Sequence, residues 1–138
     1  EQIKIHSFKR EYETVVQGNI PTDSGTIDLP IGRHRVDRKK MTVTDKNSKE
    51  AVTHYKTVKA GKRFSLLDIE IMTGRKNQIR VQLAERGNPI AGDKKYGAVT
   101  NPIHRLALHA SELEIMSPSG KHFKFRAPIP ASFAKVVK

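Results

Sequence analysis

The 138-residue sequence contains no cysteine and no tryptophan, and aromatic residues make up only 6% of it. Without cysteine the chain has no disulfide scaffold, no zinc finger and no thiolate nucleophile. It also lacks a run of about 18 apolar residues, which a transmembrane helix needs. The first residues show no apolar signal core. We therefore expect a cytoplasmic protein that does not enter the membrane.

Acidic residues are also scarce: 14 Asp and Glu stand against 26 Lys and Arg, giving a formal net charge of +12. Such an excess predicts an extended polyanion as the partner. A membrane surface is the competing interpretation, but no strongly amphipathic basic helix is evident. RNA or DNA is therefore the favoured partner.

The length corresponds to one domain. Residues 64–72 alternate, with Leu67, Ile69 and Ile71 on one face and Asp68 and Glu70 on the other, as in a half-buried strand. This run and residues 49–59 predict a hairpin around Gly61. Further strands are predicted at residues 9–17, 106–116 and 122–126.

One helix is predicted over residues 77–86, where Ile79, Leu83 and Ala84 recur at helical spacing and Gly87 follows as a cap. The opposite face of this helix is expected to be polar and exposed: Gln78, Gln82, Glu85 and Arg86. The fold class is therefore α+β, with a mostly antiparallel mixed sheet and one or two packed helices.

Residues 73–97 carry the strongest functional pattern. Arg75, Lys76, Gln78 and Arg80 gather at the start of the helix, where unpaired backbone N–H groups and the helix dipole favour an anion. The segment fills every fixed position of T-G-R-x-x-Q-I-R-V-x-L-A-x-x-G-x-P-I-x-G-D-x-x-Y-G. It resembles the third motif of the RluA-type pseudouridine synthases, and residues 9–12, Gly18, 25–34, 37–41, 49–55 and 105–110 extend the resemblance.

The resemblance implies an isomerase that converts uridine to pseudouridine in ribosomal or transfer RNA, without metal or cofactor. In this family the arginine at the position of Arg80 pairs with the catalytic aspartate, which suits a planar bidentate side chain. The tyrosine at the position of Tyr12 stands beside the target uracil. Whether its phenol acts as a base or by packing is left open.

A basic run follows Pro30, and two further cations lie at the helix start. Phosphate contacts by such residues add affinity without reading sequence. We expect the RNA-binding residues to be Arg33, Arg35, Arg38, Lys39, Lys40, Arg75 and Lys76.

Asp37 lies in a sequence, His34 to Arg38, that resembles the family's catalytic-aspartate motif. Asp37 is not at the position of the catalytic aspartate. The family's motif precedes the strand of Tyr12 and continues with Thr-Ser-Gly, whereas Asp37 follows that strand. The catalytic aspartate is therefore expected outside the chain, and residues 1–138 are expected to form the C-terminal portion of a synthase domain, inactive alone and monomeric.

Two other features are predicted to be structural. His54, His104 and His109 lack metal-ligand spacing, so no metal site is expected. The glycines between residues 87 and 97 match no phosphate-loop pattern. The alternatives to an enzyme are a non-catalytic basic RNA-binding module and a ribosome-associated structural protein. Finding the motif H-R-x-D-x-x-T-S-G upstream in the gene would favour a pseudouridine synthase over these two alternatives.

Overall fold

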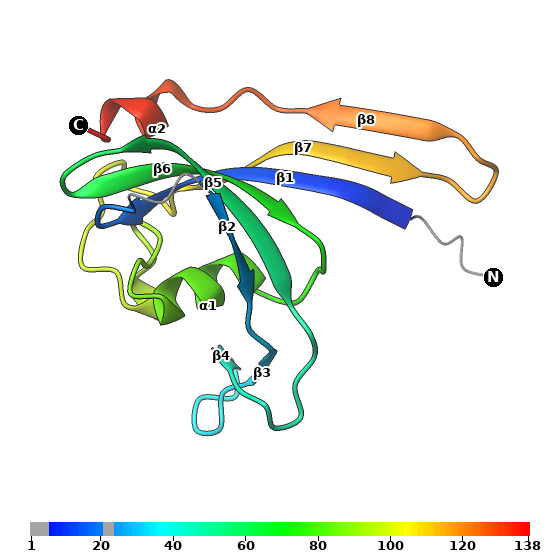
Figure 1. Cartoon of the computed structure of the whole chain (residues 1–138), viewed down its shortest axis with the longest axis horizontal. Helices are drawn as coiled ribbons and strands as arrows, with labels where there is room; N and C mark the ends of the chain where they lie inside the picture. Colours follow the sequence, from blue (N-terminus) through cyan, green and yellow to red (C-terminus); the bar gives the residue numbers. More distant parts are fainter. Residues whose placement is uncertain (1–5, 21–23) are drawn as a thin grey trace.

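The computed structural model describes residues 6–20 and 24–138 and is built around a six-stranded antiparallel sheet with the order β2-β5-β6-β1-β7-β8 (Figure 1). The strands are β1 (His6–Gln17), β2 (Ser24–Asp28), β5 (Val52–Ala60), β6 (Phe64–Ile71), β7 (Leu108–Met116) and β8 (His122–Arg126). The predicted α+β class with a mostly antiparallel sheet is confirmed.

The predicted hairpin around Gly61 joins β5 and β6, and β1 pairs with both β6 and β7. Alternation along β6 divides the sheet into two faces, as the sequence pattern predicts. Leu67 and Ile69 are 0% and 1% exposed on one face, whereas Asp68 is exposed on the other. Burial of the apolar face against a helix supplies the main hydrophobic stabilisation of the fold.

Helix α1 (Gln78–Glu85) covers this apolar face (Figure 1). Its apolar side chains Ile79 and Leu83 join the core, as predicted. The prediction that Gln78 and Gln82 are exposed is wrong, because they are 3% and 0% exposed. The Gln82 side chain donates to the carbonyls of Leu29 and Ala51 at 3.0 and 2.8 Å.

Gln78 has an equivalent task at the start of the helix. Its amide nitrogen donates to the Val52 carbonyl and to the Thr53 hydroxyl, at 3.0 and 2.8 Å. Its amide oxygen accepts from the Thr73 hydroxyl and the Arg75 backbone N–H. Buried amides that are fully hydrogen-bonded fix one helix position on the sheet. The side chain of Gln78 therefore has a structural role at the start of the helix.

A small two-stranded sheet, which the sequence patterns did not predict, lies beyond the ends of β2 and β5 (Figure 1). It consists of β3 (Ile31–Arg33) and β4 (Met41–Val43), and the residues between them form an exposed loop. Strands of three residues are too short to show a clear alternation. This loop carries most of the predicted RNA-binding cations.

The chain closes with α2 (Ala131–Lys135), whose Phe133 is 0% exposed. The Lys62 backbone N–H donates to the Lys138 carbonyl at 3.0 Å, so the end of the chain returns to the β5–β6 hairpin. A Cβ atom on Gly61 would lie 2.5 Å from that carbonyl oxygen. Glycine is therefore required at this close approach.

Candidate active site

Tyr12 and Arg80 line one small cavity of about 200 Å³ between β1 and the start of α1. Tyr12 lies opposite Ile69 in the sheet and therefore on the face that α1 covers. Ile71 and Leu108 form the apolar part of the wall, while Asn77 and Arg80 form the polar part. The two residues that the sequence places in a catalytic site, 68 positions apart, thus meet in space.

The guanidinium of Arg80 is held by the carboxylate of Asp93. Nε donates to Oδ2 at 2.9 Å and Nη2 donates to Oδ1 at 2.8 Å, which is a bidentate pair. The Asp93 side chain is 2% exposed and that of Arg80 is 22% exposed. The hydrogen bonds to Asp93 raise the pKa of Arg80, so the arginine remains charged. The resemblance pairs Arg80 with a catalytic aspartate expected outside the chain, and in this structure its partner is the carboxylate of Asp93.

The Arg80 guanidinium lies over the ring of Tyr96, with its carbon 4.9 Å from the ring centroid. Tyr96 belongs to the short 3-10 helix η1 (Lys94–Tyr96). Its hydroxyl accepts from the Asn77 side chain and from the Met41 backbone N–H, both at 3.2 Å. Asn77 caps α1 in the left-handed conformation, with φ of 55°. Together these contacts fix the plane of the guanidinium.

The β3–β4 loop reaches this site through the same tyrosine. The Lys40 ammonium lies 5.3 Å from the Tyr96 ring centroid, and that of Lys95 lies 5.9 Å from it. Lys95 also donates to the Lys39 carbonyl at 3.1 Å. A cation–π contact of this kind attracts each ammonium to the ring. Lys40 and Arg80 therefore contact the same tyrosine ring.

Arg33 at the end of β3 and the other cations of the loop are exposed: Arg35, Arg38 and Lys39. Asp37 shapes the loop through two hydrogen bonds. Its side chain accepts from the Lys39 backbone N–H at 3.1 Å, and its backbone carbonyl accepts from the Lys40 backbone N–H at 2.9 Å. Asp37 thus has a structural role in the turn between β3 and β4.

Arg75 and Lys76 precede the helix. Arg75 lines the cavity, but its Nε donates to the Glu50 carbonyl at 2.7 Å, so part of its guanidinium is already engaged. Lys76 is exposed. Of the two, only Arg75 is next to Tyr12 and Arg80.

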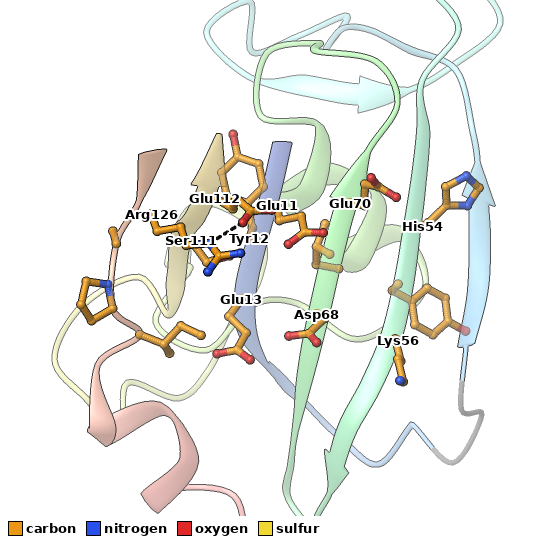
Figure 2. A pocket seen from close by; sticks show the side chains of 15 residues that line it. Glu11, Tyr12, Glu13, His54, Lys56, Asp68, Glu70, Ser111, Glu112 and Arg126 are labelled. Atoms are coloured by element: carbon orange, nitrogen blue, oxygen red, sulfur yellow. Dashed lines mark hydrogen bonds and ion pairs between the residues drawn. The ribbon is translucent and has the colours of Figure 1, made fainter. Parts of the chain in front are cut away.

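A larger hollow of about 790 Å³ occupies the opposite face of the sheet (Figure 2). Its floor is acidic, with Glu11 directly opposite Glu70 and Glu13 directly opposite Asp68 on neighbouring strands. Like charges in register repel one another. Burial is the main reason that the pKa of Glu13 rises to about 7, with a hydrogen bond to Asp68 second. These acidic side chains lie on the face of the sheet opposite to the cavity of Tyr12 and Arg80.

At the rim of this hollow, Glu112 is neutralised by three cations. Arg126 donates to its carboxylate at 2.7 Å, and Lys9 and Lys124 lie at 3.2 and 3.4 Å (Figure 2 shows the Arg126 contact). The hydrogen bond from Arg126 is the main cause that lowers the pKa of Glu112 to about 2. These cations are therefore engaged in linking β1, β7 and β8.

Within residues 6–20 and 24–138, no group of three or more His, Asp or Glu side chains is placed to hold a metal ion. His54 contacts the Thr26 hydroxyl at 2.8 Å, and His109 packs edge-on against Phe133. Over the same residues no helix is long and apolar enough to cross a membrane.

Sequence reasoning missed three residues that build the site: Asn77, Asp93 and Tyr96. Asp93 and Tyr96 are fixed positions of the pattern in residues 73–97, so the signal was present. Spacing alone gives no reason to pair Asp93 with Arg80, because a turn and a bridge to β1 separate them.

A family model described as RNA pseudouridylate synthase matches residues 1–85 of this chain. The uncharacterized RNA pseudouridine synthase YlyB of Bacillus subtilis is 43% identical over 139 residues, which cover 99% of this chain and 46% of that protein. The ribosomal large subunit pseudouridine synthase D of Pseudomonas aeruginosa is 37% identical over 96% of this chain and 45% of its own length.

Among solved structures, human RNA pseudouridylate synthase domain containing 1 superposes with a TM-score of 0.79 at 26% identity. The match covers 87% of this chain and 54% of the human one. The chain thus spans about half the length of the relatives that it matches.

Proposed function

Because the chain belongs to the RNA pseudouridylate synthase family, we propose that the complete protein isomerises uridine to pseudouridine in RNA. In this reaction the N1–C1′ bond of uridine breaks, the detached uracil turns, and C5 bonds to C1′, while the C5 proton is released and N1 takes up a proton. The observation that carries the proposal is the cavity shared by Tyr12 and Arg80.

Arg80 is suited to hold and orient a carboxylate at the reacting sugar. Its side chain stays charged, its position is fixed by Asp93, and it borders the cavity. A fixed cation beside a reacting group lowers the energy of charge that develops there, without reorganisation of solvent.

Tyr12 is suited to contact the uracil. It is half-buried on the cavity wall, where its ring offers a face for stacking and its hydroxyl offers a proton-carrying group. A base that undergoes chemistry must leave its stack. We place the entry of the extruded base on the side of the basic loop, where the phosphates would bind.

The proposed RNA-binding surface consists of the β3–β4 loop together with Arg75 and Lys76. Lys40 links the loop to the cavity through Tyr96, so the loop and cavity form one continuous basic region. The opposite face is acidic, which restricts RNA to this side. Ribosomal and transfer RNA are both candidate substrates.

The catalytic carboxylate is proposed to come from the part of the polypeptide outside residues 1–138. Residues 1–138 would then form the C-terminal portion of the catalytic domain. The relatives have about twice the length of this chain, which leaves room for such a segment.

The test is release of tritium from RNA that carries 5-labelled uridine, using the complete protein and residues 1–138 in parallel. The complete protein should release tritium from ribosomal or transfer RNA transcripts, whereas residues 1–138 should bind RNA weakly and release none. A complete protein that binds these RNAs and modifies neither would favour the non-catalytic RNA-binding module. Pseudouridine formed by residues 1–138 would refute an external carboxylate.

A further inference from the structure

We propose that Asp93 is a positioning residue for catalysis: it occupies one edge of the Arg80 guanidinium and leaves the other edge to the catalytic carboxylate. This inference rests on the proposed function and adds a residue to its site. Asp93 does not touch the reacting atoms. It acts through Arg80.

The hydrogen bonds of Arg80 show which edge is taken. A guanidinium has five N–H groups, arranged so that it can grip a carboxylate either by the Nε/Nη2 edge or by the Nη1/Nη2 edge. Asp93 fills the first edge with two short bonds, of 2.9 and 2.8 Å. Nη1 makes only a long contact of 3.4 Å with the Asn77 side chain. In the described part of the chain, one N–H on Nη1 and one on Nη2 remain unused.

The plane of Arg80 is fixed as well as its edge. The Tyr96 ring centroid lies 4.9 Å from the guanidinium carbon, and the Tyr96 hydroxyl accepts hydrogen bonds from Asn77 and Met41. A guanidinium that is gripped along one edge and packed against a ring has little freedom to turn. We infer that a carboxylate in the cavity that Arg80 lines would meet the Nη1/Nη2 edge, because Asp93 occupies the other.

The backbone that carries Asp93 is held equally firmly. The Ala91 N–H donates to the Val15 carbonyl at 2.9 Å, and the Ala107 N–H donates to the Ala91 carbonyl at 3.0 Å. Gly92 has φ of +82°, and a Cβ atom there would collide with the Arg105 carbonyl. Asp93 thus projects from a segment bonded to the central strand, which prevents it from following Arg80 if that side chain moves.

Sharing Arg80 between two carboxylates has an electrostatic consequence. A lone arginine lowers the pKa of a neighbouring carboxyl group by about 1 to 3 units. The negative charge of Asp93 offsets part of this effect on the second carboxylate. Besides orienting Arg80, Asp93 should therefore keep the pKa of the catalytic carboxylate higher than Arg80 alone would. The acid limb of the pH–rate profile should then lie at higher pH.

The test uses the complete protein with Asp93→Asn, which keeps the size of the side chain and removes its charge. We expect kcat to fall about 100-fold because Arg80 loses its fixed position, with KM for RNA changed less than about threefold, since Asp93 is buried away from RNA. The acid limb should move to lower pH by about one unit. Asp28→Asn, the matched loss of an exposed carboxylate on β2, should leave kcat and the limb unchanged.

An Arg80→Lys background shows whether Asp93 acts through Arg80. Lysine cannot form the bidentate pair, so adding Asp93→Asn should lower kcat by less than about threefold there. A further 100-fold loss in that background would overturn the inference, as would wild-type kcat and acid limb in Asp93→Asn alone. If Asp93→Asn does not fold, Asp93→Glu replaces it, and wild-type kcat in that variant overturns the inference. An inactive wild-type protein would instead refute the proposed function.

Discussion

Glu13 on β1 and Asp68 on β6 lie directly opposite each other on the acidic face of the sheet, and Glu13 is only 8% exposed. Two carboxylates in register repel each other, and burial penalises the charged form further. The pair is stable when Glu13 keeps its proton, and its pKa of about 7 reflects this. The face opposite the proposed active site is therefore sensitive to pH.

The free energy of unfolding of the wild-type chain should fall as pH rises, and Glu13→Gln should abolish this fall. The folded-state pKa of about 7 lies above the ordinary value of 4.5. The stabilising contribution is therefore complete below about pH 4.5 and is lost between about pH 4.5 and pH 7. Urea unfolding should show the free energy of unfolding of Glu13→Gln gaining roughly 1 to 3 kcal/mol on wild type between about pH 5 and about pH 8.

Glu50→Gln, which changes an exposed carboxyl in the same way, is the control and should follow the pH dependence of wild type. A Glu13→Gln variant whose stability also falls by the wild-type amount over this interval would show that Glu13 does not titrate in it.

Gln82→Ala should destabilise the fold by about 2 to 4 kcal/mol, because it removes the side-chain donor to the Leu29 and Ala51 carbonyls and the acceptor of the Thr53 hydroxyl, and opens a cavity. Chemical denaturation measures this difference. Glu85→Ala, at an exposed position on the same helix, should change the free energy of unfolding by less than about 0.5 kcal/mol. Equal effects of the two substitutions would mean that the buried amide is not a structural anchor.

Lys39→Ala with Lys40→Ala should weaken RNA binding and flatten its salt dependence. Each lost phosphate contact reduces the log–log slope by roughly 0.7 to 0.9. Binding measured at several salt concentrations gives the slope. The matched control is Lys62→Ala with Lys121→Ala, two exposed lysines at other ends of the sheet. If both pairs change the slope equally, the effect comes from net charge and not from a defined RNA surface.

The sequence predicted the elements with clear periodicity: the Gly61 hairpin, the strand after it and the helix with Ile79 and Leu83. It failed at Gln78 and Gln82, because residue type suggests exposure and only the positions of Val52, Thr53 and Ala51 reveal their partners. The three-residue strands β3 and β4 carry too little pattern to detect. The partnership of Asp93 with Arg80 depends on a tertiary bridge between Val16 and Ile90, which no local rule encodes.

The most direct test of the central claim compares Arg80→Ala with Arg86→Ala in the complete protein. Both remove one arginine from the same helix region, but only Arg80 lines the cavity with Tyr12. Loss of one partner from a buried charge pair costs about 3 to 5 kcal/mol, so tritium release from 5-labelled uridine should fall to background in Arg80→Ala while RNA binding changes little. Arg86→Ala should retain nearly full turnover. Near-normal turnover in Arg80→Ala would contradict the account.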